Sequence, residues 1–501
     1  MRKRIMSNLK IPLFLQVLAL YAVAAALFAG ILFVAPGFLG TDDYYHARIS
    51  TEILEQRRLA LDFQWLPLTI LSPERFSDHH LLFHLYVAPF TLLGDITGAK
   101  IATLSIAAGI VVAAWALLRR LGVRYATLWA LGMFAVSTPF LYRTLMIRTQ
   151  GASVLLLILT LIVLSAHRRY WRWLIPLAFA YTWLYDGFIL LPIFAGFYSA
   201  AAWFTDRKFE PRPVIYALIG VALGLVINPY FPQNIAFIWD HLLAKVNIDN
   251  SVRLGSEWYP YETTDLLYNS FGALIAFALG MLAPSLKEGK RDRMETTLLM
   301  CAFLTLYMLM RSRRFTEYFP AFALLFSAAA WGRVDFIALL PRRLQWRPLT
   351  PLIGTIALVA LTYNFYMPAY FQARDSRSPD YFAGASAWLR DNAPDGAIIF
   401  QTDWDDFTRL FFYNPENVYI VGLDPTYLQL ADPVMWDQWV SITRGEVDNP
   451  SSLINFVFGA RYVVSDASHE AFREKAGIDP AMEVVYQDIY NTVWRINPIA
   501  R

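Results

Sequence analysis

Charged residues are scarce in this sequence of 501 residues. Asp, Glu, Lys and Arg together make up 17% of it, whereas hydrophobic residues make up 57%. Average soluble domains carry roughly 25% charged residues, so the composition excludes an ordinary soluble protein and indicates that lipid surrounds most of the chain. The formal net charge of +3 is too small to indicate nucleic-acid binding, and no nucleic-acid partner is expected.

Cysteine is almost absent as well, because Cys301, within an apolar run, is the only one. A single thiol cannot form an intramolecular disulfide, so cysteine usage gives no indication of the compartment. A cleavable signal peptide is not expected either. The apolar stretch 11–39 that follows the basic N-terminus is too long for one and lacks a convincing small-residue cleavage site. We interpret it as a retained first membrane helix.

Long apolar runs are what the sequence has in abundance. A helix needs about 20 apolar residues to cross the hydrocarbon layer of a membrane. About eleven candidate spans follow, at 11–38, 100–118, 125–141, 151–166, 172–185, 187–204, 213–229, 266–284, 294–310, 317–332 and 348–366. The segment 81–94 is short and interrupted by His84 and Pro89, so we expect it to lie at the interface or to re-enter the membrane.

The basic residues predict the orientation of these spans, because short Lys/Arg-rich connections stay in the cytoplasm. With eleven spans the strongly basic connections all fall on one side, namely Arg2–Arg4, Arg119–Arg124, His167–Arg172, Arg207–Arg212, Lys287–Arg293 and Arg342–Arg347. We therefore expect a multi-pass protein of the cell (plasma) membrane, with a cytoplasmic N-terminus and an extracytoplasmic tail.

The tail differs in character from the rest of the chain. It has ordinary globular composition, helical spacing at 380–390, and strand-like runs at 397–400, 418–421, 462–464 and 484–486. The predicted fold class is thus a polytopic α-helical membrane domain at 1–366, followed by an extracytoplasmic α/β domain at 367–501 that is large enough to hold its own core.

The first outer connection carries the densest polar cluster. Directly after the first span come Asp42, Asp43, His46 and Arg48. Carboxylates at a membrane surface can bind a divalent metal or accept a proton, and an arginine suits a phosphate. The alternative is a helix cap, since Thr41 or Asp42 could begin a helix running through Leu61.

Other outer connections add histidines and arginines. His79 and His80 form a pair that could bind metal or simply make interfacial hydrogen bonds. Arg143 and Arg148 face the same side as the acidic loop and suggest an anion site. The turn 311–317, which holds Arg313 and Arg314, breaks the positive-inside pattern; phosphate binding is one reason, and pairing with Glu317 and lipid phosphates is the other.

These residues together resemble the catalytic subunit of oligosaccharyltransferases, within the glycosyltransferase C (GT-C) superfamily. Asp42-Asp43-Tyr44-Tyr45-His46 resembles the acidic first-loop motif, whose aspartate holds a metal and orients the acceptor; Asp43 is the better match and Asp42 the alternative. Ser256-Glu257 resembles the mobile-loop motif ending in glutamate, and Arg313-Arg314-Phe315 the stretch near the lipid pyrophosphate. Trp183 with Gly187 is similar to a family pattern more weakly.

The sequence also departs from the family pattern at two places. Where the family has WWDYG, which recognises the acceptor, only Trp404 and Asp405 match. The second outer loop, Arg148-Thr149-Gln150-Gly151, lacks the acidic pair that would hold a metal. Three possibilities remain open: loose binding of Mn²⁺ or Mg²⁺, recruitment of His79 or His80 as ligands beside Asp43, or a metal-free mechanism.

The resemblance implies a membrane glycosyltransferase that uses a polyprenyl-phosphate or -pyrophosphate donor and an extracytoplasmic acceptor, either protein or glycan or lipid. Its implied site residues are Asp43, Asp42 and Glu257 for catalysis; Arg313, Arg314, Arg148 and Arg143 for the donor phosphate; and Trp404, Asp405 and His46 for the acceptor. The alternatives are a relative that only binds lipid-linked glycan, or a transporter, for which Asp186 would be a weakly placed intramembrane carboxylate.

Overall fold

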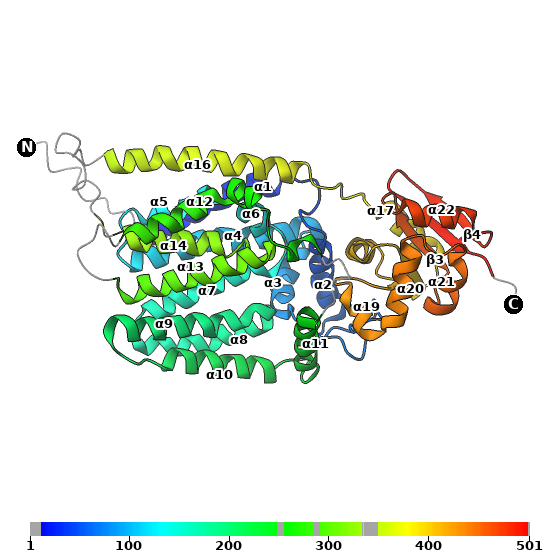
Figure 1. Cartoon of the computed structure of the whole chain (residues 1–501), viewed down its shortest axis with the longest axis horizontal. Coiled ribbons are helices and arrows are strands. Elements are labelled where there is room, and N and C mark those ends of the chain that lie inside the picture. The colour runs from blue at the N-terminus through cyan, green and yellow to red at the C-terminus, as the bar shows by residue number, and fades with distance from the viewer. Residues whose placement is uncertain (1–11, 248–254, 284–290, 333, 335–348, 499–501) are drawn as a thin grey trace, which may run out of the picture.

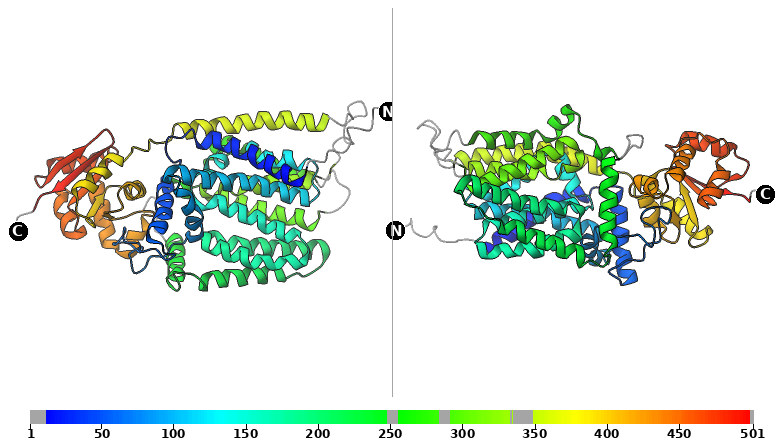
Figure 2. Two further views of the ribbon diagram at one scale, coloured as in Figure 1. Left: turned by 180° about the vertical axis from the view of Figure 1, so that it is seen from behind. Right: turned by 60° about the horizontal axis from the view of Figure 1, so that its bottom comes forward.

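The computed structural model describes residues 12–247, 255–283, 291–332, 334 and 349–498. It is an elongated molecule with a body of helices that run along the long axis and a small α/β domain attached at one end (Figure 1). Figure 2 shows the same arrangement from two further sides. The basic clusters predicted at Arg2–Arg4, Lys287–Lys290 and Arg342–Arg347 lie outside the described residues.

The helices of the body follow the predicted apolar runs closely. They are α1 (Leu13–Leu32), α4 (Asp95–Arg120), α5 (Ala126–Leu131), η1 (Gly132–Ala135), α6 (Thr138–Thr144), α7 (Thr149–Ser165), η2 (Arg168–Trp173), α8 (Leu174–Leu184), η3 (Asp186–Ile189), α9 (Leu190–Asp206), α10 (Arg212–Val226), α12 (Thr263–Leu282), α13 (Arg293–Arg311), α14 (Phe319–Trp331) and α16 (Leu349–Arg374). The domain boundary predicted after residue 366 falls inside α16, which continues to Arg374.

Within the described ranges, six helices are long and apolar enough to cross a membrane, and a seventh crossing results if α6 and α7 count as one span bent by 103°. The chain is therefore a multi-pass membrane protein, but the predicted number of eleven spans is not confirmed. Several predicted spans are shorter helices, and the run 125–141 is divided into α5, η1 and α6.

Neighbouring helices of the body approach closely where glycines face a neighbour. At Gly220 in α10, an added Cβ would lie 2.3 Å from the carbonyl oxygen of Ile175 in α8. At Gly224, one turn further on, it would lie 2.7 Å from Cβ of Thr182. Small residues let helix backbones pack without intervening side chains, which matters in lipid because packing drives helix association there.

Polar contacts join several basic connections at the end of the body remote from the α/β domain. Arg293 pairs with Asp206, and Arg168 pairs with Glu210. Arg119 donates a hydrogen bond to the side chain of Gln16 near the start of α1, at 3.1 Å. These described parts of the predicted basic connections thus lie together at one end.

The opposite end of the body is formed by three helices that lie across the bundle. They are α2 (Asp42–Gln56), α3 (Leu81–Thr91) and α11 (Gln233–Asn247) (Figure 1). The helix that the sequence offered as an alternative, running through Leu61, does form as α2 but ends at Gln56, where Arg57 adopts a left-handed conformation with φ 53°. Helix α3 has only 11 residues, as expected for the short segment 81–94.

The α/β domain contains one five-stranded sheet. Its strands are β1 (Ile398–Gln401), β2 (Val418–Tyr419), β3 (Tyr462–Asp466), β4 (Met482–Gln487) and β5 (Asn491–Ile496), in the order β2-β1-β3-β5-β4. Strands β2 and β3 pair parallel with β1, whereas β5 is antiparallel to both its neighbours. The four predicted strands are confirmed, and β5 was missed.

Helices surround this sheet, and the first outer loop of the chain joins its core. The helices are α17 (Ala383–Asn392), α18 (Phe407–Tyr413), α19 (Thr426–Ala431), α20 (Pro433–Thr443), α21 (Pro450–Phe458) and α22 (Glu470–Ile478). Phe63 and Trp65 are buried in one apolar cluster with residues of the domain. The indole N–H of Trp65 donates to the carbonyl of Pro415 at 2.6 Å, and its own carbonyl accepts from the backbone N–H of Tyr419 at 2.8 Å.

Candidate active site

A cavity of about 980 Å³ lies between the end of the helical body and the α/β domain. Ten of the predicted site residues line it: Asp42, His46, His79, His80, Arg143, Arg148, Glu257, Arg314, Trp404 and Asp405. Asp43 and Arg313, which the structure also describes, do not line it. The residues come from segments far apart in the sequence, so the fold brings together what the sequence presents as separate motifs.

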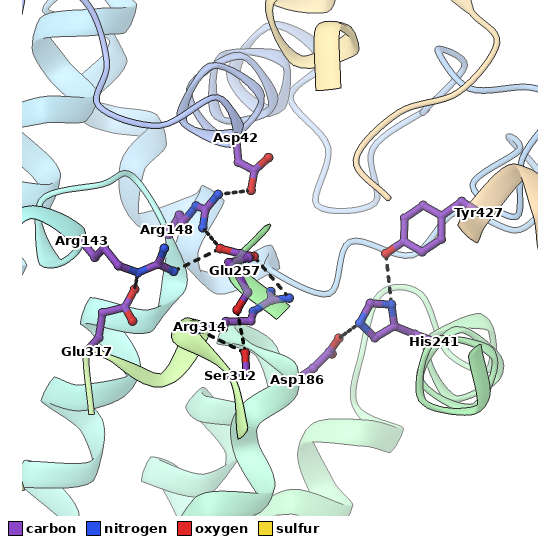
Figure 3. A network of polar contacts seen from close by, with 10 residues as sticks. All are labelled: Asp42, Arg143, Arg148, Asp186, His241, Glu257, Ser312, Arg314, Glu317 and Tyr427. Carbon is purple, nitrogen blue, oxygen red and sulfur yellow. Dashed lines mark hydrogen bonds and ion pairs between the residues drawn. The ribbon is translucent and has the colours of Figure 1, made fainter. Parts of the chain in front are cut away.

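Arg148 connects the two sides of the site. It precedes the first residue of α7 in extended conformation, at the sharp bend between α6 and α7. One terminal nitrogen donates to Oδ2 of Asp42 at 2.6 Å, and the other donates to Oε2 of Glu257 at 2.7 Å. Arg148 therefore holds two carboxylates at once, as Figure 3 shows.

Glu257 is the centre of the network in Figure 3. Besides Arg148, its carboxylate contacts Arg143 at 3.2 Å and Arg314 at 3.7 Å. Burial alone would raise the pKa of Glu257, but the guanidinium groups of Arg148, Arg314 and Arg143 outweigh it and hold the pKa well below its usual value. Three arginines thus converge on one anionic position.

Two short 3₁₀ turns hold this cluster in place, η4 (Ser256–Trp258) and η6 (Arg313–Phe315). The hydroxyl of Ser312 donates to the carbonyl of Glu257 at 2.7 Å. The backbone N–H of Arg313 donates to the carbonyl of Tyr259 at 3.0 Å. The guanidinium of Arg314 lies 4.6 Å from the ring centroid of Trp258. The two turns therefore position Glu257 and Arg314 as one unit.

The two predicted aspartates of α2 have different surroundings. Asp43 is fully buried, its Oδ2 accepts from the backbone N–H of Gly40 at 2.9 Å, and burial raises its pKa to about 6. The side chain of Asp42 is 30% exposed and faces the cavity. Thr41 makes no side-chain capping bond at the start of α2. Asp42, given as the alternative from the sequence, is the one that the fold brings to the cavity.

The two adjacent arginines of η6 differ in the same way. Arg314 lines the cavity. Arg313 instead donates from Nε to the carbonyl of Pro260 at 3.1 Å and lies over the ring of Tyr261. Of the two arginines predicted to bind the donor phosphate, only Arg314 therefore faces the cavity.

The α/β domain contributes its own side chains through η8 (Trp404–Asp406). Asp403 begins this turn by accepting the backbone N–H of Asp405 at 3.1 Å. Burial, followed by the nearby charges of Asp42 and Asp403, raises the pKa of Asp405 to about 6. Trp404 and Asp405 thus line the cavity close to the start of α2.

A second contact across the cavity was not predicted from the sequence. The hydroxyl of Tyr427 in α19 and Nδ1 of His241 in α11 lie 3.1 Å apart. Nε2 of His241 lies 3.9 Å from Oδ2 of Asp186. Asp186 therefore lines the cavity beside α11, in contrast to the mid-membrane position that a transporter would use (Figure 3). The sequence marked Asp186 only as the carboxylate of the transporter alternative and gave no sign of its contact with His241.

The carboxylates present here do not form a ready ligand set for a divalent metal. Asp42 and Glu257 are both occupied by Arg148, and Asp43 lies outside the cavity lining. In the described ranges, no group of three or more His, Cys, Asp or Glu side chains is placed to hold a metal ion. A Mn²⁺ or Mg²⁺ ion needs several oxygen ligands, so this arrangement does not fit the metal that the sequence left open.

This architecture, with outer loops and a C-terminal domain enclosing a cavity over a bundle of membrane helices, is the kind of fold that the sequence predicted. It is similar to the oligosaccharyltransferase of Archaeoglobus fulgidus in its apo form, with a TM-score of 0.64, 15% identity, and coverage of 92% of this chain and 71% of that one. Archaeal oligosaccharyltransferase AglB from Archaeoglobus fulgidus, in complex with an inhibitory peptide and a dolichol-phosphate, gives a TM-score of 0.67 at 13% identity, covering 92% and 71%.

ArnT from Cupriavidus metallidurans, bound to undecaprenyl phosphate, is similar over 96% of this chain and 98% of that chain, with a TM-score of 0.58 and 16% identity. No family model matches the sequence, and no curated protein matches it. At these identities the comparisons establish the fold.

Proposed function

We propose that this protein is a membrane glycosyltransferase. It transfers a sugar or glycan from a polyprenyl phosphate or pyrophosphate to an acceptor outside the cytoplasm, which is a protein, a glycan or a lipid. The convergence of Arg143, Arg148 and Arg314 on one anionic position inside the cavity carries the proposal. Arginine forks match phosphate oxygens in geometry as well as in charge.

The cluster supports stabilisation of a leaving phosphate. When the bond between the sugar and the phosphate breaks, negative charge grows on the phosphate oxygens, and fixed guanidinium groups lower the energy of that state. Arg148 and Arg314 also each have a buried Nε–H with no hydrogen-bond partner among the described residues. Such unfilled donors indicate that the site has capacity for a further anionic group.

In this proposal Asp42 and the α/β domain bind the acceptor. Asp42 faces the cavity from the first turn of α2 and orients the acceptor, while Trp404 and Asp405 contact it from the α/β domain. This role was expected for Asp43, which is buried behind the cavity wall.

Arg148 supports a mechanism that needs no metal. A divalent cation between two carboxylates balances their charge, and here the guanidinium of Arg148 occupies that place between Asp42 and Glu257. Because this cation is part of the chain, transfer is expected to continue when divalent ions are removed with a chelator. Loss of transfer in chelator and its return with Mn²⁺ would contradict this part of the proposal.

The adjacent arginines of η6 offer a sharp test of the phosphate site. Undecaprenyl phosphate is titrated by calorimetry into the detergent-solubilised protein and into the variants Arg314→Gln and Arg313→Gln. We expect Arg314→Gln to weaken binding by roughly 10-fold to 100-fold, the value of a charge-assisted hydrogen bond or two. Arg313→Gln should bind like the wild type, because its side chain contacts Pro260 outside the cavity lining.

Equal losses in both variants would mean nonspecific attraction of the lipid to surface charge. If the wild type binds undecaprenyl phosphate but transfers no sugar, the alternative holds, and the protein only binds lipid-linked glycan. Transfer is followed with radiolabelled sugars on undecaprenyl phosphate and pyrophosphate, offered with peptide, glycan and lipid acceptors. Absence of both binding and transfer would refute the proposed function.

A further inference from the structure

A buried chain of two histidines and one aspartate leads to the cavity wall. Nδ1 of His84 in α3 lies 2.7 Å from Oδ2 of Asp78, and Nε2 of His84 lies 2.8 Å from Nδ1 of His46 in α2. The side chains of Asp78 and His84 are 1% and 0% exposed. His46 is the member that lines the cavity, so the chain runs from a buried carboxylate to the site.

This geometry fixes the positions of the protons when the rings are neutral. A carboxylate only accepts hydrogen bonds, so Nδ1 of His84 must carry the proton that it donates to Asp78. Nε2 of His84 is then an acceptor, and Nδ1 of His46 must donate to it. Nε2 of His46 is left without a proton, and no described protein group is hydrogen-bonded to it.

We propose that Nε2 of His46 is the general base that accepts a proton from a hydroxyl group of the acceptor, an inference that rests on the proposed glycosyltransferase function. The relay from Asp78 through His84 selects the tautomer that leaves this lone pair available. The acceptor chemistry that suits an imidazole base is a hydroxyl, such as that of a sugar, a lipid or a serine or threonine side chain.

The reaction balances without a further reagent. The acceptor oxygen forms a bond to the anomeric carbon, and the bond between that carbon and the phosphate oxygen breaks with its electron pair staying on the phosphate. The acceptor proton passes to Nε2 of His46. The proton on Nδ1 of His46 can then shift to Nε2 of His84, which puts the positive charge directly beside the carboxylate of Asp78.

The surroundings of His46 suit this role. Asp42 and His46 are four residues apart on α2, so they share one face of the helix, and both line the cavity. Burial, followed by the nearby His84, Arg148 and His79, lowers the pKa of His46 well below its usual value, so its ring is neutral before the acceptor proton arrives. The arginine that would stabilise the leaving group thus lies near the proposed base.

Replacing Asp78 by asparagine should reverse the direction of the hydrogen bonds along this chain without changing the size of the side chain. Its Oδ1 accepts the backbone N–H of His80 at 2.9 Å. In Asp78→Asn the amide oxygen must keep that position, because the backbone group is a donor, so the amide nitrogen faces Nδ1 of His84. That nitrogen donates, both histidines take the opposite tautomer, and Nε2 of His46 becomes protonated.

Nitrogen NMR of the full chain in nanodiscs, with ¹⁵N-labelled histidine, tests the tautomers directly. The chain has seven histidines, and single His→Gln variants assign the signals of His46 and His84. We expect the Nδ1–H form for His46 in the wild type and the Nε2–H form in Asp78→Asn. An Nε2–H signal for His46 in the wild type would overturn the inference, whatever the activity.

Kinetics then separate this inference from the proposed function. With any donor and hydroxyl acceptor that the wild type uses, Asp78→Asn should lower kcat about 100-fold or more and change KM less than about threefold. Asp62→Asn, an exposed residue of the same loop, should behave like the wild type. Transfer by the wild type with an unchanged kcat in Asp78→Asn would refute only the base; no transfer by the wild type would refute the proposed function and this role together.

If Asp78→Asn does not fold, judged by thermal melting, His46→Gln decides the question. It removes the base but keeps a side chain that can donate to His84. We expect undecaprenyl phosphate to bind this variant as it binds the wild type, while kcat falls about 100-fold or more. A normal kcat in this variant would overturn the inference.

Discussion

At the scale of single residues, the anionic position between the arginines is already filled. The Glu257 carboxylate lies where three guanidinium groups converge, and its side chain is 21% exposed. In the proposed function a phosphate must share or take over this position. In that function Glu257 competes with the donor for the same cations, which differs from the catalytic role that the resemblance implies for it.

The variant Glu257→Gln tests this competition. Removing the carboxylate leaves Arg148 and Arg314 with fewer anionic partners, so we expect undecaprenyl phosphate to bind about 10-fold more tightly, measured by calorimetry. The exposed Glu262→Gln serves as control and should not change the affinity. Weaker binding in Glu257→Gln would mean that Glu257 supports the phosphate site through other contacts.

The sequence predicted which motifs meet but could not choose between adjacent residues. Successive side chains on a helix point about 100° apart, so of Asp42 and Asp43 only one can face the cavity. The same holds for Arg313 and Arg314 in η6. The sequence motif does not distinguish between the two adjacent residues. Which of them faces the cavity depends on how the helix packs in the folded chain. His84 was noted only as an interruption of an apolar run, and its contacts with Asp78 and with His46 of α2 appear only in the folded chain.

At the scale of helices and strands, the apolar runs located the helices but not their breaks. The run 125–141 was predicted as one span, yet Ser137 begins a new helix by accepting the backbone N–H of Phe140, with Pro139 in its first turn. A serine cap with a proline in the first helical turn is a start signal for a helix, and hydropathy does not register it. Strand β5 was missed although its neighbour β4 was predicted.

The close packing of α10 against α8 favours a glycine at position 220. Gly220→Ala puts a methyl group against the carbonyl of Ile175, so we expect it to cost about 2 kcal/mol and to lower the melting temperature by several degrees. A Cβ added at Gly196 in α9 would meet no atom within 4 Å beyond the local backbone of its own helix, and Gly196→Ala should leave the melting temperature unchanged or raise it slightly. Equal effects of the two changes would contradict this account of the contact between α8 and α10.

At the scale of the whole molecule, we expect the two ends of the helical body to lie on opposite sides of the membrane. Single cysteines are introduced at exposed positions as Lys208→Cys, in the connection between α9 and α10, and Asp391→Cys, in the α/β domain. Cys301 is fully buried and gives little background. We expect a membrane-impermeant maleimide to label Asp391→Cys in intact cells and to label Lys208→Cys only after the membrane is opened. The reverse pattern would invert the predicted orientation.

The contact between the first outer loop and the α/β domain can form only late in the synthesis of the chain. Trp65 and Pro415, which share a hydrogen bond, are 350 residues apart in the chain. At roughly 5–20 residues per second, a ribosome needs on the order of 20 to 70 seconds to synthesise the chain between them. During that time Phe63 and Trp65 have no domain core to enter, so a nascent chain presents aromatic side chains to chaperones. The cavity closes only when the last quarter of the protein has been translated, and truncated products are left open.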